Sequence, residues 1–294
     1  MPRITVIVPS FDRPDRLAAC LAALAAQTGG PYPTVVVDDG SPTPLAEICA
    51  PFPWVTCLRQ GNAGPAAARN AGARVAREDG AEFLCFTDDD CRPRPDWVQA
   101  LVAAHGGDPA RLVGGGVTNA LESNVYAGAS QSLCDYLYDY FGAADGQAPF
   151  FTSNNIGCAA EGFDALGGFD DSFPLAAAED RDFGLRWRDR IGPLIYAPEA
   201  VVDHAHPLTL RKFWRQHTNY GRGARHLHRT MSARGDDRPR REPAAFYTGL
   251  LLHPLRDRGP NAVSRAALMG LSQVAMVVGY TKEARTEPVS YTHL

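Results

Sequence analysis

The chain has 294 residues, 45% of them hydrophobic, so it can form a full enzyme domain with an extension. Its seven cysteines form no C-x-x-C pair and no His/Cys zinc spacing, which indicates thiols of a reducing cytosol and excludes a disulfide scaffold. The net charge of −4 is unevenly distributed: residues 207–258 hold twelve Lys or Arg against four Asp or Glu. That excess of +8 leaves −12 elsewhere, so we expect two parts with different partners and no nucleic acid among them.

The hydropathy pattern predicts neither a secretion signal nor a membrane span. The apolar run after the N-terminal Met-Pro-Arg is too short for a signal peptide, so we expect an unsecreted protein. No window reaches the roughly 18 uninterrupted apolar residues that a spanning helix needs. The nearest, residues 266–280, contains Ser272 and Gln273 and predicts a packed helix.

Short β-branched runs alternate with helical patterns in the first part of the chain. The runs predict strands at residues 4–8, 34–37, 55–58 and 82–86. The intervening patterns predict helices at residues 16–27, 44–50, 65–77 and 95–105. This rhythm predicts an α/β fold with a mostly parallel sheet and helices on both faces.

The later elements are less regular. We predict strands at 112–117 and 194–197, helices at 123–141 and 176–188, and loops at 153–157 and 167–169. After residue 205 the composition turns basic, so the predicted domains are a catalytic body (1–205) and a basic helical extension (206–285). The last residues, 286–294, have no periodic pattern and are expected to form a disordered tail.

Acidic groups follow two of the predicted strands. Asp38 and Asp39 come after the second strand, and Asp88, Asp89 and Asp90 come after the fourth. Parallel sheets bind ligands at the carboxyl ends of their strands, and Mg²⁺ or Mn²⁺ prefers oxygen ligands. The triplet is therefore a candidate metal and phosphate site, with a solvated acidic turn as the alternative.

The other candidate residues also have structural alternatives. Asp38 or Asp39 could accept a hydrogen bond from a nucleotide base or ribose. For one of the two, the alternative is a structural role in an Asx turn with Gly40 and Ser41. Arg69 lies in a small-residue helical segment, whose packing on a sheet explains the alanines and not the arginine. The pair at residues 179 and 180 opens a predicted helix, where acids also suit the helix dipole.

Seven motifs in order make the chain resemble a known family. They are I-T-V-I-V-P-S-F-D-R-P-D-R-L, Q-T, V-V-V-D-D-G-S, G-P-A-A-A-R-N-A-G-A, F-T-D-D-D-C, G-G-F-D-D and A-E-D-R-D-F-G-L-R. From about Ile4 to the region of His204 the chain resembles glycosyltransferase family 2. The resemblance implies a GT-A fold, a Rossmann-like sheet flanked by helices.

The resemblance implies a donor-binding set. Asp39 would contact the nucleotide base, Pro9 and Asp12 would line its pocket, and Arg69 would assist. Asp88 would lie near the donor ribose or sugar, and Asp89 and Glu179 join this set with less defined roles. The expected donor is a UDP-sugar.

The resemblance also implies a metal and a base. Asp90 would ligate Mn²⁺ or Mg²⁺ on the diphosphate, and Asp180 would be the catalytic base. His204 or His206 matches a histidine near the metal; the spacing leaves both open, and a structural histidine is the alternative. An inverting transfer needs these parts, because a base takes the proton of the acceptor hydroxyl while the diphosphate departs.

The expected reaction moves one sugar to a small-molecule, glycan or lipid-linked acceptor, in the synthesis of glycans, cell envelope, glycolipids or secondary metabolites. The Q-x-x-R-W motif of processive family members is replaced by Q-H-T-N-Y at residues 216–220, which favours a single addition. A nucleotidyltransferase and a non-catalytic nucleotide-sugar or glycan-binding protein are the alternatives. No G-x-G-x-x-G motif follows the first strand, which weakens a dinucleotide-binding interpretation. No glycine-rich phosphate loop follows it either, which argues against a nucleotidyltransferase.

The basic segment from Arg211 to Thr230 interleaves arginines with Trp214 and Tyr220. Such a segment could hold a lipid-linked acceptor or contact an anionic membrane surface. A solvated face of packed helices explains it equally well. We therefore expect a cytoplasmic protein. If the basic segment does contact a membrane, we expect the contact to be peripheral and at the inner face.

Overall fold

The computed structural model describes residues 2–142, 150–173, 175–236, 242–256 and 261–286. They form two compact units: residues 1–121, 137–174 and 179–206 belong to the first, and residues 122–136, 175–178 and 207–294 to the second. The predicted domain boundary at residue 205 stays a prediction. The predicted tail, apart from Thr286, lies outside the described residues.

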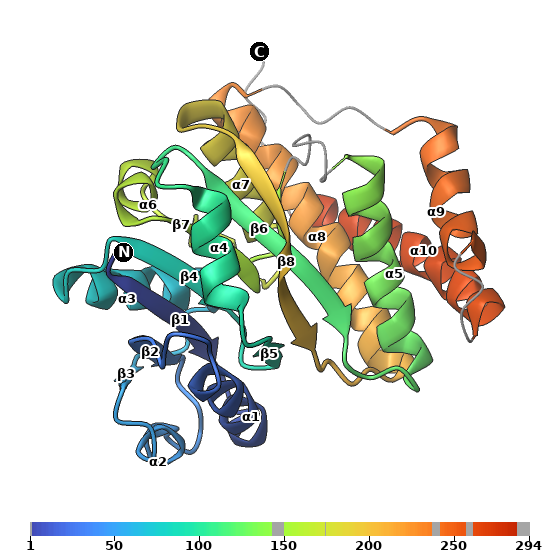
Figure 1. Ribbon diagram of the computed structural model, residues 1–294. Helices are drawn as coiled ribbons and strands as arrows, with labels where there is room; N and C mark the ends of the chain where they lie inside the picture. Colours follow the sequence, from blue (N-terminus) through green and yellow to red (C-terminus); the bar gives the residue numbers. More distant parts are fainter. Residues whose placement is uncertain (1, 143–149, 174, 237–241, 257–260, 287–294) are drawn as a thin grey trace. The chain divides into compact units, whose positions relative to one another are not determined.

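The first unit contains one eight-stranded sheet with the strand order β3-β2-β1-β4-β7-β6-β8-β5 (Figure 1). The strands are β1 (Ile4–Ser10), β2 (Thr34–Asp38), β3 (Val55–Arg59), β4 (Phe83–Thr87), β5 (Cys91–Pro93), β6 (Leu112–Asn119), β7 (Asn155–Ala159) and β8 (Leu194–His204). β7 and β5 are antiparallel to their neighbours, and the other six strands share one direction. The sheet is therefore mostly parallel, as predicted.

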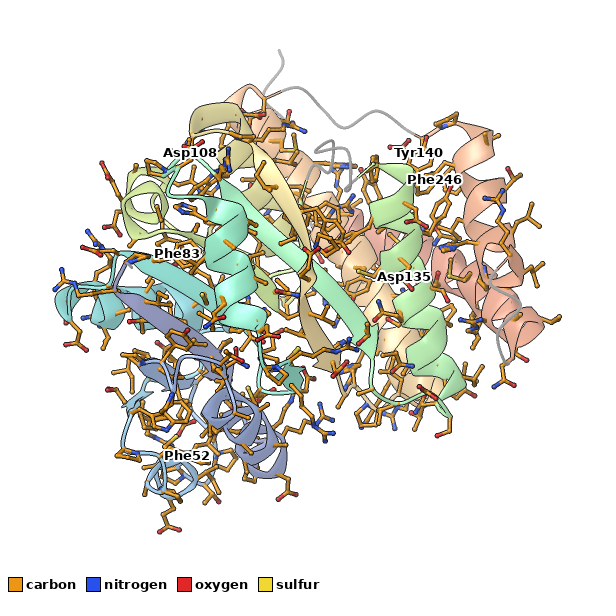
Figure 2. The ribbon with its side chains drawn as sticks, in the orientation of Figure 1. Phe52, Phe83, Asp108, Asp135, Tyr140 and Phe246 are labelled. Atoms are coloured by element: carbon orange, nitrogen blue, oxygen red, sulfur yellow. The ribbon has the colours of Figure 1, made fainter. Side chains whose placement is uncertain are left out.

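Helices cover both faces of this sheet because its strands are apolar on both sides. Ile7 of β1 is buried with α3 (Pro65–Glu78), α6 (Ala160–Leu166) and α7 (Glu179–Arg190). Its neighbours Val6 and Val8 point to the other face, as alternation along a strand requires. That face is covered by α1 (Pro14–Ala25), α2 (Ala46–Cys49) and α4 (Trp97–His105). Phe83 of β4, for example, packs on His105 of α4 with ring centroids 4.8 Å apart (Figure 2).

One strand prediction and one loop prediction are wrong. The strand predicted to end at Ala197 continues to His204, because a register shift between Gly115 and Gly116 of β6 accommodates the residues around Pro198. The loop predicted at 153–157 is largely β7, which lies buried between β4 and β6. Its Asn and Gly residues have low strand propensity, and the pairing on both sides overrides that preference.

The second unit is helical. It contains α8 (Leu210–Arg234), α9 (Ala244–Arg256), α10 (Ala262–Thr286) and the residues of α5 (Val125–Tyr140) as far as Tyr136. α8 and α10 approach closely at two glycines: a Cβ on Gly221 would lie 1.9 Å from the carbonyl oxygen of Met276, and one on Gly279 would lie 1.9 Å from that of Thr218. Only glycine permits this backbone contact, so the predicted C-terminal extension is a packed helical bundle.

α10 contains the packed helix that the sequence predicts at residues 266–280. From Ala262 to Arg285 it is long and apolar enough to cross a membrane by length and composition, with a mean hydropathy of 1.4 in its most apolar window. Only 22% of that window is buried, so α10 packs along one side and leaves the other exposed.

Candidate functional site

The candidate site lies at the carboxyl edge of the sheet in the first unit. β1, β2 and β3 are paired so that Ser10 lies opposite Asp38 and Asp38 opposite Arg59, all at the strand ends. β5 is antiparallel to β8 with Cys91 opposite His204, which brings the preceding residue, Asp90, beside the end of β8. The sheet thus collects the predicted acidic residues and both histidines at one edge.

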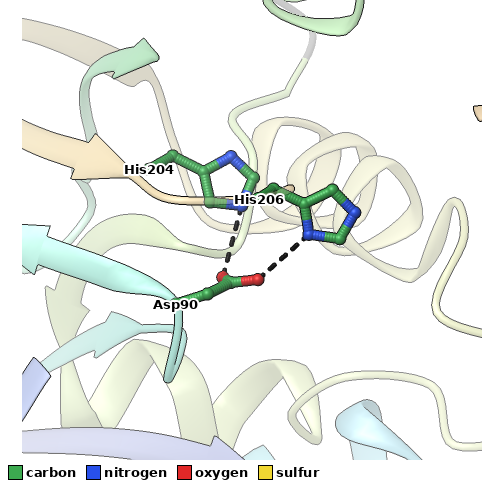
Figure 3. A group of neighbouring side chains, drawn as sticks. All are labelled: Asp90, His204 and His206. Atoms are coloured by element: carbon green, nitrogen blue, oxygen red, sulfur yellow. Dashed lines mark hydrogen bonds and ion pairs between the residues drawn. The ribbon is translucent and has the colours of Figure 1, made fainter. Parts of the chain in front are cut away.

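Asp90 is a buried carboxylate shared by two histidines (Figure 3). Its Oδ1 lies 3.2 Å from Nε2 of His204, and its Oδ2 lies 3.1 Å from Nδ1 of His206. Burial would raise the pKa of Asp90, but hydrogen bonds and charge from both histidines hold it well below its usual range. The sequence left the two histidines as alternatives, and the structure brings both to the same carboxylate.

These three side chains suit a divalent cation. One ligand atom from each lies within 4.8 Å of the others, and a carboxylate with two imidazoles is a donor set for first-row metals. Burial lowers the pKa of His204, but the Asp90 carboxylate outweighs burial and raises it. A cation would have to replace that proton, so metal binding would be stronger at higher pH.

Asp89 is held on the other side of the triplet by polar contacts. Its Oδ2 accepts a 2.7 Å hydrogen bond from Oγ of Ser10, and its Oδ1 lies 3.0 Å from Nη1 of Arg13. Burial raises the pKa of Asp89 to about 6, although Arg13 opposes the shift. Asp89 therefore anchors the turn to β1 rather than pointing into solvent.

Arg69 connects the Asp triplet to the acidic pair of α7. This buried guanidinium reaches Asp88 through Nη2 at 2.7 Å and Glu179 through Nη1 at 3.3 Å. The Asp88 side chain is 30% exposed, so it is the member of the triplet most open to a ligand. Among the described residues, Nε of Arg69 and Oε2 of Glu179 have no hydrogen-bond partner.

The acidic pair itself has raised pKa values. Burial, with the neighbouring Asp180 charge, raises the pKa of Glu179 to about 7 against the pull of Arg69. Burial also raises the pKa of the half-buried Asp180, although the Arg181 N–H donates to its Oδ1 at 2.8 Å. A carboxylate with a raised pKa is a stronger base, which suits the role predicted for Asp180.

Asp38 and Asp39 have different partners. Asp38 accepts from the backbone N–H groups of Ser41 and Leu45 and pairs with Arg59 at 2.6 Å, so the Asx-turn alternative applies to it. Asp39 accepts from the N–H groups of Ala63 and Gly64, both at 2.9 Å. The Asp39 carboxylate thus organises the loop before α3, and its predicted contact with a base stays a prediction.

The two remaining predicted residues lie at the end of β1 and just after it. Pro9 is buried within β1, so its ring forms part of the sheet edge. Asp12 is exposed, has a left-handed backbone (φ +54°) and donates its N–H to Oγ of Ser41 at 2.9 Å. That contact joins the loops that follow β1 and β2.

Two arginines of the site were not predicted. Nη1 of Arg16 lies 3.0 Å from Oδ2 of Asp90, and Nη1 of Arg13 lies 3.3 Å from the same atom. They lie at the start of α1, in the R-P-D-R run directly after the first strand. Their position after a strand was the available signal; their contact with a triplet more than 70 residues away comes from β1–β4 pairing.

Fold and site together define a class: an α/β protein of the nucleotide-binding kind, with carboxylates and histidines gathered where its parallel strands end. Comparison with known families narrows the class. The sequence model of glycosyl transferase family 2 matches residues 5–160, a little over half of the chain. The chain therefore belongs to glycosyl transferase family 2.

Individual relatives agree with this assignment. The pre-mycofactocin glycosyltransferase of Mycobacterium tuberculosis is 27% identical over 75% of this chain and 46% of its own. The mannosyltransferase PcManGT of Pyrobaculum calidifontis, solved with GDP-Man and Mn²⁺, has a TM-score of 0.68 at 17% identity and covers 97% of this chain and 88% of its own. GalNAc-T7, solved with UDP, GalNAc and Mn²⁺, has a TM-score of 0.57 at 16% identity, over 76% and 48%.

These comparisons confirm the family and the GT-A-like fold expected from the motifs. At 17% and 16% sequence identity, these two structural similarities support the fold assignment only. The matches to several curated relatives, including the pre-mycofactocin glycosyltransferase, span less than half of each relative's length.

Proposed function

We propose that the protein is an inverting glycosyltransferase that moves one sugar from a nucleoside diphosphate donor to an acceptor hydroxyl. The observation that carries the proposal is the Asp90 carboxylate between His204 and His206 at the carboxyl edge of a family 2 sheet. A glycan, cell-envelope, glycolipid or secondary-metabolite acceptor fits the family, and the cysteine spacing in the sequence supports a cytosolic location.

The donor side of the proposal uses the residues at the strand ends. Asp39 and the loop that it organises would bind the base, and Asp88 would accept from a ribose or sugar hydroxyl. Asp90, His204 and His206 would hold Mn²⁺ or Mg²⁺, which when bound offsets the charge of the departing diphosphate. Arg13 and Arg16 would add positive charge there, since both already lie against Asp90.

The acceptor side uses Asp180. Its carboxylate would take the proton of the acceptor hydroxyl as the oxygen attacks the anomeric carbon, on the side opposite the leaving diphosphate. Arg69 and Glu179 position this carboxylate: Arg69 holds Glu179, the residue before Asp180, and at the same time holds Asp88. One buried guanidinium thus fixes the donor and acceptor sides relative to each other.

The test is donor hydrolysis with a panel of UDP- and GDP-sugars and Mn²⁺ or Mg²⁺, because relatives of this fold were solved with either nucleotide. We expect slow metal-dependent release of a nucleoside diphosphate by the wild type. Asp180→Asn should keep nucleotide and metal binding and lose about 10²- to 10⁴-fold in turnover, the usual share of a positioned base.

The matched control is Asp171→Asn, which changes an exposed acid outside the proposed site and should keep wild-type turnover. Full activity of Asp180→Asn would remove Asp180 as the base. Release of pyrophosphate from a nucleoside triphosphate would indicate a nucleotidyltransferase instead. Donor binding without turnover on any acceptor would indicate a binding protein.

A further inference from the structure

The second unit carries a group of exposed apolar side chains on two helices. Of the ten large apolar side chains that are exposed in the described residues, seven lie on α9 and α10. They are Tyr247, Leu251, Leu252 and Leu255 on α9 and Val263, Val274 and Val277 on α10. We call these seven residues the α9–α10 face. Such a concentration calls for a covering partner, because single exposed apolar residues are normally scattered.

On α9 the exposed residues follow the helical repeat. Tyr247, Leu251 and Leu255 are four residues apart and therefore lie along one side of the helix. The other side is buried in the unit, where the Phe246 ring packs on Tyr136 of α5 with centroids 5.3 Å apart (Figure 2). α9 is thus apolar on the side that packs and on the side that does not.

On α10 the exposed valines also share one side. At about 100° per residue, Val263, Val274 and Val277 fall within about 60° of one another around the helix. The opposite side contacts α8 through Gly279. Because that contact is backbone against backbone, α10 cannot leave the bundle to cross a membrane without breaking the unit.

The exposed sides of the two helices form one surface. α9 and α10 lie side by side (Figure 1). A Cβ on Gly270, which lies between Val263 and Val274 on α10, would be 3.6 Å from Cδ2 of Leu251. Leu251 therefore joins the two rows of apolar side chains.

The charges around this surface favour one kind of partner. α9 and α10 contain a single acidic residue, Glu283, and it pairs with Arg222 at 2.7 Å. Arg256, Lys282 and Arg285 are exposed near the helix ends. Apolar side chains with cationic ones at their margin match the acyl chains and phosphates of an anionic membrane, whereas two copies of this face would bring like charges together.

We propose that the α9–α10 face docks the protein on an anionic lipid bilayer, with both helices lying in the interface. The sequence suggested α8 for this role, yet much of its positive charge is used within the unit. Arg222 pairs with Glu283, Arg225 lies over the Tyr280 ring, and Arg229 contacts His226. This docking does not depend on the proposed sugar transfer.

The test is co-sedimentation of the full chain with phosphatidylcholine vesicles, with and without phosphatidylglycerol. We expect binding to the mixed vesicles, weakened by salt. Leu251→Glu and Val274→Glu should each lower the partition coefficient about tenfold, because each places a charge in the apolar contact. Leu210→Glu adds the same charge at an exposed leucine outside the face and should stay within about twofold of wild type.

Several results would overturn the proposal. The first is absence of binding by the wild type, and the second is equal loss of binding in Leu210→Glu. The third is sedimentation of the wild type as a dimer that Val274→Glu dissociates, without vesicle binding, which would make the face an interface between copies.

If a Glu variant has a lower melting temperature than the wild type, Leu251→Ser and Val274→Ser are used in its place. Donor hydrolysis without vesicles should be unchanged in all variants, so failure here is separable from failure of the proposed function.

Discussion

Arg69 shows how much one side chain can organise in this site. It is buried, yet its two terminal nitrogens reach acids from different elements, Asp88 after β4 and Glu179 at the start of α7. A buried charge is tolerated only when it is paired, so removing either acid would leave the guanidinium undercompensated. The positions of Asp88 and Asp180 are therefore coupled through a residue that need not touch the substrate.

The raised pKa of Glu179 predicts a pH dependence of stability. The folded protein holds this pKa at about 7, whereas an unfolded chain ionises near the ordinary value of 4.5. Below the ordinary value both states are protonated and the burial penalty is absent; it grows as pH rises and is complete above 7. Glu179→Gln cannot ionise at this position. Between pH 5 and pH 8 its free energy of unfolding should therefore fall less than that of the wild type, and the difference between the two decreases should be roughly 2 kcal/mol.

Urea unfolding at pH 5 and pH 8 measures this difference. Glu161→Gln, which removes an exposed acid at the start of α6, is the control and should follow the wild type. Equal slopes for Glu179→Gln and wild type would show that Glu179 ionises in the folded protein as it does in the unfolded chain.

We expect the two histidines to contribute about equally to metal binding. Each lies within 3.2 Å of the Asp90 carboxylate, so His204→Ala and His206→Ala should both weaken Mn²⁺ binding, by about tenfold or more. Titration of Mn²⁺ into the protein checks this, with His228→Ala of the second unit as control. A variant that binds Mn²⁺ like the wild type would show that its histidine is structural.

At the scale of elements, the sheet edge depends on how closely α3 packs. Gly72 of α3 faces β1 and β2: a Cβ there would lie 2.7 Å from Cγ2 of Ile7 and 3.1 Å from Cγ2 of Val37. The helix also carries Arg69, so its distance from the sheet sets the position of the guanidinium. The alanine-rich segment is therefore a packing helix, as the structural alternative held, and it delivers a site residue as well.

Gly72→Ala should lower the free energy of unfolding by about 1 to 3 kcal/mol, because the added methyl overpacks the contact between helix and sheet. Gly61→Ala is the matched control: a Cβ there meets nothing within 4 Å, and its effect should stay within about 0.5 kcal/mol. Chemical denaturation of both variants measures the difference. A neutral Gly72→Ala would mean that α3 can shift without cost.

The elements also show what local patterns can predict. The strands that became β1, β2, β3 and β4 were located to within about two residues, because each is an apolar run bounded by turn residues. β7 and the second half of β8 were missed. Asn155 and Gly157 of β7 have weak strand preference, and Pro198 interrupts the pattern of β8, but pairing with distant strands holds both segments in the sheet.

For the whole molecule, ligand binding should stabilise the unit that contains the site. Mn²⁺ with a nucleoside diphosphate should raise its melting temperature, corresponding to about 2.7 kcal/mol at a hundred times the dissociation constant. Asp90→Asn should abolish the part of the shift that depends on Mn²⁺ and retain part of the nucleotide shift. Scanning calorimetry checks this, with Asp171→Asn as control. An unchanged Mn²⁺ shift in Asp90→Asn would place the cation elsewhere.

The sequence by itself determined the family, the alternation of strands and helices, and the acidic residues at the ends of strands, because these depend on local periodicity and chain order. The tertiary structure decided which residues meet. It brought both histidines to Asp90, bound Arg13 and Arg16 to the triplet, assigned Asp38 to a turn, and left one side of α9 and α10 exposed. These are long-range outcomes of strand pairing and helix packing, which no local pattern contains.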